Sequence, residues 1–413
     1  MKIEKLIEYI KKNIPFYQKN EYKDYKSIEQ FPLITKYMIR EDYGSFVSNG
    51  LGEDKDKLVD LLETKTLSTK GWYNEIGAVK GVFVEETSGT TGVPFLCAKS
   101  ETERTRLGIV LWKERQNRDP LVNGENYFQF SHIRRNMINP NAYDYELNHL
   151  IDLYSQIKAR KIRWIHGTPN AIINHVKVFK ENGIRFFLPE LKYIECTGTY
   201  LSSETKHLIE EYFDVTVLDL YGSIETWPIA LTCNEGKMHL IEKNVYFELV
   251  DPEGNVINEK GIIGRVVATT LVNQVFPLIR YTMGDYAMYV DCAPCKCGCK
   301  GRVIQLVEGR DNNIIKGLPQ TKFGNKEFAR MVATVKLRFP ELDLRYIKII
   351  QNSVTDFEVW INDFGNVDEF VDSLKEIMQV EFEKILFVSV KKMTATQIDE
   401  RKYDKPNIFI CKC

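Results

Sequence analysis

The chain has 413 residues, 44% of them hydrophobic, and its 56 lysines and arginines nearly balance its 57 aspartates and glutamates. The resulting formal charge of −1 excludes a general attraction to nucleic acid or to an anionic membrane surface, so any anion site must be local. A chain of this length predicts two or more domains. Because it has no run of about eighteen apolar residues and no apolar signal sequence at its N-terminus, we expect a cytoplasmic protein without a membrane span.

The first half of the chain predicts helices followed by an α/β core. Residues 1–43 read as polar helices with breaks at Pro15 and Pro32. Strands are predicted over 127–130, 164–166, 193–196 and 215–220, and helices over 102–115, 148–159, 171–182 and 203–212, the last capped by Ser202 or Ser203. This alternation between residues 82 and 244 predicts parallel strands covered by helices.

After residue 244 the pattern changes to strands over 245–250, 264–270 and 287–290, separated by polar turns, which predicts a smaller β-rich layer. Further on, strands over 344–350, 357–361 and 385–390 and a helix over 367–382 predict a compact α+β unit. We place the boundary at Asp311. The sequence thus predicts an α/β protein with a large N-terminal domain, residues 1–310, and a small C-terminal domain, residues 311–413.

The loop from Thr87 to Pro94 is rich in hydroxyl groups and glycines, which is typical of a phosphate-binding loop. Glycines let the backbone approach a polyanion, and amide and hydroxyl groups donate short hydrogen bonds to phosphate oxygens. An ordinary polar turn has the same composition, so the loop alone does not decide between the two.

Three later segments also fit the binding of a nucleotide and its phosphates. Tyr221 and Glu225 follow a predicted strand, where a ring can stack on a base and a carboxylate can bind Mg²⁺. Asp285 comes after a glycine turn and is suited to ribose hydroxyls, while Arg310 and Asp311 lie at the domain junction and suit a nucleotide and a hinge. Each segment alone also fits a plain turn.

Four segments, taken together and in this order, resemble the motifs of the adenylate-forming acyl-CoA synthetase superfamily. They are Thr87–Pro94, Tyr221–Glu225, Tyr281–Asp285 and Gly309–Asp311. The branch that the chain most resembles is that of phenylacetate-CoA ligase and its relatives. Segments 15–17, 31–36 and 167–170 support this branch, as does Phe95 where most of the superfamily has a lysine. The resemblance covers nearly the whole chain.

This resemblance implies that a carboxylic acid attacks the α-phosphate of ATP to form an acyl-adenylate, and that a thiol, usually that of coenzyme A, then displaces AMP. Such a site must neutralise the charge on the transition state and hold the acid and ATP in line. The implied phosphate-binding residues are Thr87, Ser88, Gly89, Thr90, Thr91 and Gly92, with Thr91 also catalytic. The resemblance also implies that Tyr221 and Gly222 lie against adenine, that Glu225 binds Mg²⁺, and that Asp285 and Arg310 bind the ribose. It implies Asp311 as the hinge between the domains. Lys405, or else Lys402, is the implied catalytic lysine of the small domain.

Two positions depart from the family pattern. Ile224 stands where relatives have a threonine or serine that donates to the α-phosphate, and Tyr200 stands where they often have a glutamate. Loss of one such donor weakens a site by about 100-fold without abolishing the chemistry. The alternatives are therefore a ligase that transfers the acyl group to an amine or a carrier protein, or a non-catalytic relative that binds an acid or a nucleotide.

Four of the nine cysteines lie between residues 292 and 299, which favours a metal over disulfides in a reducing compartment. Cys295 and Cys297 resemble half of a zinc site found in part of this branch, and Cys233 and His239 fit the other half. Two or three thiolates with an imidazole select zinc, in a structural site when all four positions are filled. Cys292 or Cys299 could replace one ligand, and free surface cysteines are the alternative.

Aromatic residues near the predicted strand ends are candidates for an acid-binding pocket suited to a flat or aromatic acid. They are Phe130, His132, Trp164, His166, Tyr200 and Trp227, together with Phe128 and Ile229. Any one of them fits plain core packing equally well. The partners expected are thus a small carboxylic acid, ATP with Mg²⁺ and coenzyme A, with an amine or a carrier protein as the alternative acceptor.

Overall fold

The computed structural model of this chain describes residues 1–63, 79–87, 95–124, 126–130, 145–290, 294–310, 314–318, 322, 324–339, 342, 347–361, 367–393 and 408–412, with only the backbone of 308–310 and 326. Its contacts divide the chain into two units. The first comprises Met1–Met283 with Ala287–Gln305, and the second comprises Gly284–Tyr286 with Leu306–Cys413. The predicted boundary at Asp311 lies outside the described residues. No helix in the described ranges is long and apolar enough to cross a membrane.

Short helices form the start of the first unit, as the sequence predicts. They are α1 (Ile3–Asn13), η1 (Pro15–Gln18), η2 (Asn20–Tyr22), η3 (Ile28–Gln30), α2 (Lys36–Glu41), α3 (Tyr43–Phe46), η4 (Asn49–Leu51) and α4 (Asp54–Glu63). Helix α1 ends before Pro15, which opens the next turn at a position where its missing N–H costs nothing. Tyr17 and Phe31 pack edge-to-face and help to bury this segment.

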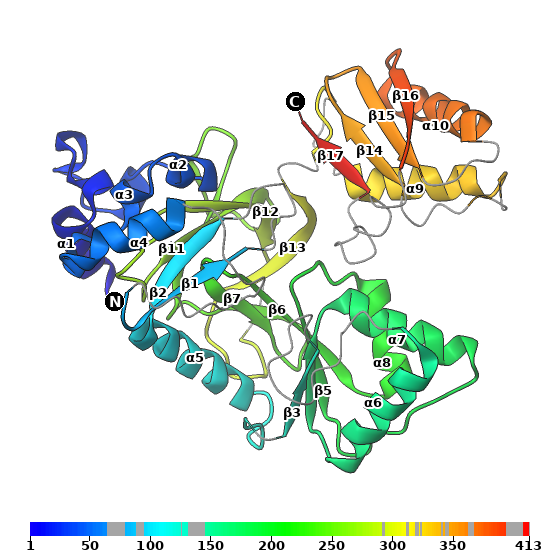
Figure 1. The fold of residues 1–413 in the computed structure, drawn as a ribbon, viewed down its shortest axis with the longest axis horizontal. Coiled ribbons are helices and arrows are strands. Elements are labelled where there is room, and N and C mark those ends of the chain that lie inside the picture. Colours follow the sequence, from blue (N-terminus) through cyan, green and yellow to red (C-terminus); the bar gives the residue numbers. More distant parts are fainter. Residues whose placement is uncertain are drawn as a thin grey trace. The chain divides into compact units, whose positions relative to one another are not determined.

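One sheet of eleven strands forms the centre of the first unit, in the order β10-β9-β11-β12-β13-β8-β7-β6-β5-β4-β3 (Figure 1). Its strands are β3 (Tyr127–Gln129), β4 (Trp164–Gly167), β5 (Tyr193–Thr197), β6 (Thr216–Ser223), β7 (Trp227–Thr232), β8 (Met238–Leu240), β9 (Val245–Val250), β10 (Val256–Ile257), β11 (Ile263–Thr270), β12 (Tyr281–Tyr289) and β13 (Val303–Arg310). Strands β3 to β6 pair in parallel, whereas β6 and β7 pair antiparallel. The predicted β-rich part therefore continues the same hydrogen-bonded sheet instead of forming a separate layer.

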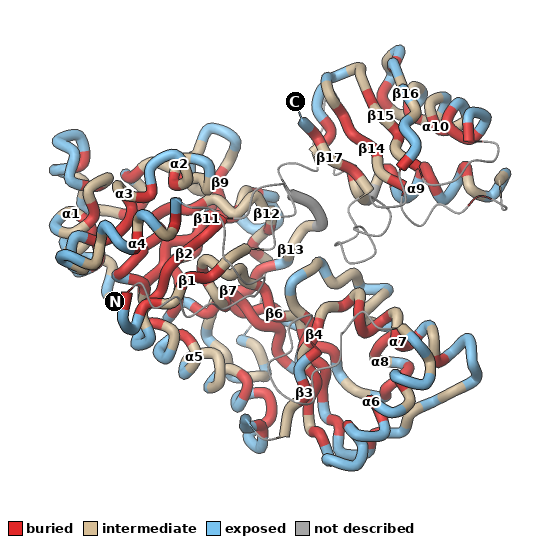
Figure 2. Tube along the Cα trace, viewed as in Figure 1, coloured by how far each residue is buried: buried red, intermediate tan, exposed pale blue. Residues whose placement is uncertain are grey.

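Helices cover the parallel half of this sheet. They are α6 (Leu147–Ala159), α7 (Pro169–Glu181) and α8 (Ser203–Phe213) on one face (Figure 1). Helix α5 (Glu101–Gln116) packs on the opposite face, where its Trp112 contacts Trp164 of β4. Helix α8 starts at Ser202, whose hydroxyl accepts a hydrogen bond from the Thr205 N–H, so the predicted cap is present. Figure 2 shows buried residues running along the central strands. Apolar residues of β3 to β6 and of α6 to α8 form one hydrophobic cluster.

A two-stranded hairpin, β1 (Val82–Glu86) and β2 (Leu96–Ser100), carries the glycine-rich loop of residues 87–94 between its strands. Its apolar face packs with α2 to α4 and with Tyr281 in a second hydrophobic cluster. Among the described residues, this cluster shares no member with the one beneath α6 to α8. The loop therefore rests on a base that is packed independently of the parallel strands.

The second unit is an α+β fold, as predicted. It contains α9 (Gly324–Lys336), β14 (Lys348–Gln351), β15 (Asp356–Ile361), α10 (Val367–Phe382), β16 (Phe387–Lys392) and β17 (Phe409–Cys411). Its four strands are ordered β16-β15-β14-β17. Phe328 of α9 and Phe357 of β15 lie fully buried in its core. The α10 bounds match the prediction, whereas α9 and β17 were not predicted.

Candidate active site

The glycine-rich loop is closed at its base by two hydrogen bonds. The Thr87 N–H donates to the Phe95 carbonyl at 2.9 Å, and the Phe95 N–H donates to Thr87 Oγ1 at 3.0 Å. Ser88, Gly89, Thr90, Thr91 and Gly92 lie outside the described residues, so their contacts with phosphate stay a prediction. The hairpin fixes where the loop leaves and rejoins the fold.

The motif Tyr221–Glu225 forms the end of β6 and the tight turn into β7. A β-bulge interrupts the pairing at Tyr221 and Gly222, and a Cβ on Gly222 would lie 2.2 Å from the Trp227 carbonyl oxygen, so only glycine fits there. The Thr226 N–H donates to Ser223 Oγ at 3.2 Å and stabilises the turn. Glu225 is thereby presented at the strand end where parallel pairing changes to antiparallel.

Tyr281 joins the second and third motifs to the base of the loop. Its hydroxyl donates to Glu225 Oε1 at 3.0 Å, and its ring stacks on Phe95 with the ring centroids 6.2 Å apart. Phe95, at the position where most of the superfamily has a lysine, is only 1% exposed. Tyr281 therefore links the Glu225 carboxylate to Phe95, the residue at the base of the glycine-rich loop.

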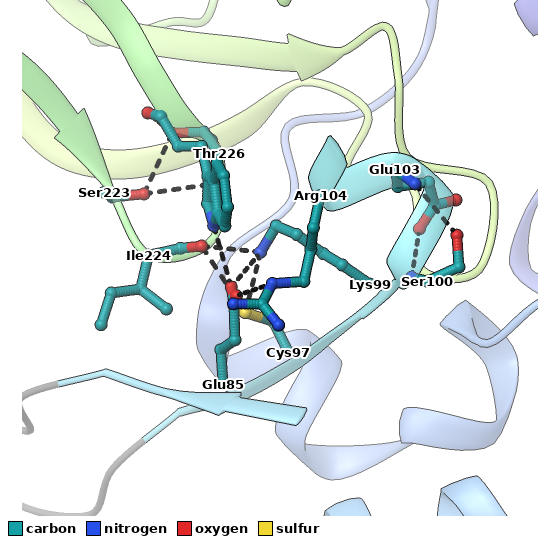
Figure 3. Close-up of polar contacts among 10 residues, drawn as sticks. Glu85, Cys97, Lys99, Ser100, Glu103, Arg104, Ser223, Ile224 and Thr226 are labelled. Carbon is teal, nitrogen blue, oxygen red and sulfur yellow. Dashed lines mark hydrogen bonds and ion pairs between the residues drawn. The ribbon is translucent and has the colours of Figure 1, made fainter. Parts of the chain in front are cut away.

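Beneath the turn lies a buried polar cluster that the sequence did not reveal (Figure 3). Lys99 Nζ, fully buried, donates to Glu85 Oε2 and to the Ile224 carbonyl, both at 2.7 Å. The Trp227 indole N–H donates to the same Glu85 oxygen at 3.0 Å. Arg104 lies 3.3 Å from the other Glu85 oxygen.

The charges in this cluster follow from burial and pairing. Burial alone would lower the pKa of Lys99, whereas its ion pair and hydrogen bond with the Glu85 carboxylate raise it, and the ammonium group stays charged. Burial raises the pKa of Cys97 to about 12, so its thiol stays neutral. Lys99 and Glu85 thus form a buried ion pair.

A second buried ion pair lies at the carboxyl ends of β4 and β5. Arg115 of α5 binds both oxygens of Glu195, at 2.9 and 2.6 Å, and His166 Nδ1 lies 2.7 Å from Glu195 Oε1. Burial would raise the pKa of Glu195, but Arg115 and His166 lower it to about 2, so the carboxylate is charged. Glu195 therefore fixes the orientation of the partly exposed His166 ring.

The predicted pocket residues do not line one surface. Phe130 is buried among the residues beneath α6 and α7, whereas Trp164 is buried on the opposite face of the sheet, stacked on Tyr193 at 5.6 Å. Tyr200 is 44% exposed and Trp227 is partly buried. Phe128 and Ile229 are buried core residues, and His132 lies outside the described residues. Contact of these residues with an acid stays a prediction.

The residues predicted to bind ribose, to form the hinge and to act as the catalytic lysine lie only partly within the described residues. Asp285 lies in β12 and Arg310 ends β13, but the Arg310 side chain lies outside the described residues. The same is true of the whole of Asp311, Lys402 and Lys405. Their roles in ribose binding, hinge motion and catalysis stay predictions.

Asp219, two residues before Tyr221 in β6, has a perturbed carboxyl group that sequence reasoning missed. Burial raises its pKa to about 7, and nearby Lys206 offsets this only in part. Folding therefore favours proton uptake by Asp219, since the pKa of an unfolded aspartate is about 3.9. This contribution to stability is fully present below about pH 4 and is lost as the pH rises through 7.

We expect Asp219→Asn to remove this pH dependence. At pH 8 the variant should be more stable than the wild type, by on the order of 1–3 kcal/mol, because no charge is then buried; at pH 5 the difference should be small. Urea unfolding at both pH values measures this, with the exposed Asp152→Asn as control. Parallel pH profiles for Asp219→Asn and wild type would contradict the assignment.

The four predicted metal ligands come together in the first unit. Cys233 lies between β7 and β8, His239 in β8, and Cys295 and Cys297 between β12 and β13, and their ligand atoms all lie within 4.8 Å of one another. Cys233 Sγ and Cys295 Sγ are 3.7 Å apart, and Cys297 Sγ and His239 Nε2 are 3.4 Å apart. Sulfur ligands at about 2.3 Å from a tetrahedral zinc ion are separated by about 3.8 Å, so the spacing fits zinc.

The surroundings of these ligands also fit a metal site. His239 Nδ1 lies 3.0 Å from the Gly301 carbonyl, which directs Nε2 toward the three sulfur atoms. The Cys299 N–H lies 3.4 Å from Cys297 Sγ, a backbone contact typical of the surroundings of a bound thiolate. Cys292, the other substitute considered, lies outside the described residues.

Comparisons with known proteins agree with this geometry. No protein-family profile matches the chain. Phenylacetate-coenzyme A ligase of Thermus thermophilus is 24% identical over 197 residues, which are 46% of this chain and 42% of that enzyme. The match thus spans less than half of that relative. Protein CapK of Staphylococcus aureus is 22% identical over an alignment of 434 positions, gaps included, which covers 98% of this chain and 88% of that protein.

Among solved structures, 2-hydroxyisobutyryl-CoA ligase in the postadenylation state with 2-HIB-AMP matches 99% of this chain and 88% of its own, with a TM-score of 0.62 and 14% identity. A fatty acyl-adenylate ligase, from work on the E. coli and L. pneumophila enzymes, matches 79% of this chain and 66% of its own, with a TM-score of 0.52 and 12% identity. The chain therefore has the α/β fold of the adenylate-forming ligases. Its sequence similarity lies with the phenylacetate-CoA ligase-like branch, which confirms the resemblance seen in the motifs.

Proposed function

We propose that this protein is an AMP-forming acid–thiol ligase that activates a carboxylic acid with ATP and transfers the acyl group to the thiol of coenzyme A. The observation that supports the proposal is the position of Tyr281 between two of the motifs. Its hydroxyl contacts Glu225 of the β6–β7 turn, and its ring stacks on Phe95, which bonds to Thr87 at the base of the glycine-rich loop.

In the first step, an oxygen of the acid attacks the α-phosphorus of ATP, and the bond to pyrophosphate breaks. The loop of residues 87–92 would supply donors to the phosphates, and Tyr221 and Gly222 would lie at adenine. Glu225 would bind Mg²⁺, which neutralises phosphate charge, and Tyr281 would hold the carboxylate in place. Lys405 would stabilise the charge that develops on the α-phosphate.

In the second step, the thiol attacks the acyl carbon, and the bond to AMP breaks. Asp285 and Arg310 would hold the ribose through this step, and Asp311 would act as the hinge. The acid is proposed to be aromatic, supported by Trp227 at the turn, by the exposed ring of Tyr200 after β5 and by the oriented ring of His166. An amine or a carrier protein as acceptor is the alternative, as is binding without turnover.

Cys233, His239, Cys295 and Cys297 are proposed to hold a structural zinc ion. The set supplies four ligands, which leaves no open position for a substrate, so the ion would stabilise the fold without taking part in the reaction.

Pyrophosphate release from ATP and Mg²⁺, measured over a panel of aryl and alkyl acids with hydroxylamine present, tests the adenylation step. We expect acid-dependent pyrophosphate and a matching hydroxamate, and a thioester when coenzyme A replaces hydroxylamine. Hydroxamate formation without a thioester would favour the amine or carrier-protein acceptor. If no acid in the panel supports pyrophosphate release although the protein binds ATP, the result would favour the non-catalytic alternative.

A further inference from the structure

Both ends of the turn that presents Glu225 are attached to one buried ion pair. Before Glu225, the Ile224 carbonyl accepts a hydrogen bond from Lys99 Nζ at 2.7 Å. After Glu225, the Trp227 indole N–H donates to Glu85 Oε2, the oxygen that also accepts from Lys99. The Glu85–Lys99 pair thus holds the Ile224 backbone before the proposed magnesium ligand and the Trp227 side chain after it. Figure 3 shows Glu85, Lys99 and Ile224 in this cluster.

This attachment joins the turn to the hairpin that carries the phosphate-binding loop. Glu85 lies in β1, two residues before Thr87, and Lys99 lies in β2, four residues after Phe95. Glu85 and Cys97 are direct partners across the hairpin, which places the Lys99 side chain on the same face as Glu85. Both side chains are 0% exposed, so water does not compete for their hydrogen bonds.

Trp227 is a point where the turn would relax without this attachment. Its φ of +60° lies in the left-handed region, which a tryptophan rarely adopts, and such a conformation persists only where neighbouring contacts hold it. The indole bond to Glu85 and the position of Arg104, 5.7 Å from the indole ring, supply those contacts. Lys99 contacts the backbone carbonyl of Ile224, so this attachment does not depend on the side chain at that position.

We propose that Lys99 is a positioning residue, which with Glu85 fixes the β6–β7 turn against the β1–β2 hairpin and so sets the position of Glu225 relative to the phosphate-binding loop. The inference rests on the proposed function for its link to Mg²⁺ and ATP. The attachment of the turn is independent of that function. Lys99 itself need touch neither substrate.

The test uses the full-length double variant E85Q/K99M. Removing Lys99 alone would leave a buried carboxylate and risk misfolding, whereas the double change removes both charges and still deprives the Ile224 carbonyl of its donor. The matched control is D119N/R163M, which removes another ion pair of the same unit, distant in sequence from the turn. Hydrogen exchange of a peptide over 221–227 and calorimetric binding of ATP with Mg²⁺ are measured on each folded protein.

In E85Q/K99M we expect exchange over 221–227 to accelerate at least about tenfold and the Kd of Mg·ATP to rise at least about fivefold, whereas D119N/R163M should leave both close to wild type. Unchanged exchange over 221–227 would overturn the inference. Faster exchange with an unchanged Kd would also overturn it, since the pair would then be structural only. Wild-type protein that binds no Mg·ATP would contradict the proposed function, and the exchange data would still decide whether Lys99 holds the turn.

Discussion

Glu225→Gln is expected to lower kcat/KM for acyl-adenylate formation by at least about 100-fold, because the amide keeps the shape of the side chain but removes the charge that would bind Mg²⁺. The hydrogen bond from Tyr281 can still form to an amide oxygen, so the fold should be preserved. The rate of hydroxamate formation, measured over a range of Mg²⁺ concentrations, gives the effect, and half-saturation should require more Mg²⁺ than in the wild type.

Two further variants make this result specific. Glu204→Gln, on the exposed first turn of α8, changes charge by the same amount and should leave the rate unchanged. Tyr281→Phe removes only the hydroxyl that orients Glu225, and a loss of about tenfold is expected. A Glu225→Gln protein with the wild-type rate and Mg²⁺ dependence would show that another group binds the metal.

Cys297→Ser should remove the zinc ion and destabilise the first unit by at least about 3 kcal/mol, since structural zinc contributes on the order of 10 kcal/mol or more in small domains. Four ligands from three separate segments would lose their common partner. Elemental analysis should find close to one equivalent of zinc in the wild type and little in the variant, and the variant should unfold at a lower temperature.

Cys299→Ser is the control for this experiment. Cys299 contacts Cys297 Sγ through its backbone N–H, so the variant should keep both the zinc and the wild-type Tm. Loss of zinc from Cys299→Ser would instead make Cys299 a ligand. Wild-type protein purified without chelator and free of zinc would contradict the metal site.

The parallel half of the fold was predictable because its segments are periodic and bounded by clear caps. Strands β4 and β5 and helices α6, α7 and α8 lie within a few residues of their predicted bounds. The end of β6 was predicted as a loop, because Tyr221 and Gly222 look like a turn. In the structure the strand continues through them, since a bulge lets it pair with β7.

The grouping of Cys233, His239, Cys295 and Cys297 was also predicted, Cys295 and Cys297 from their close spacing and Cys233 and His239 from the family resemblance. The Glu85–Lys99 pair was not. A lysine is rarely buried, and the sequence alone does not single out Lys99, which the hairpin register places on the same face as Glu85. The one signal available was a pair of opposite charges flanking a glycine-rich loop. The predicted aromatic pocket failed to form one wall because alternate residues of β3 and β4 point to opposite faces.

The two hydrophobic clusters that share no residue have a consequence for how such a protein evolves. Substitutions at separate sites without common partners change free energy additively, so repacking beneath α6 to α8 need not disturb the turn beside the hairpin. The packing beneath α6 to α8 and the packing around the hairpin are then separately adjustable. A lineage with this fold can accumulate small changes in one cluster while the other stays under constant selection.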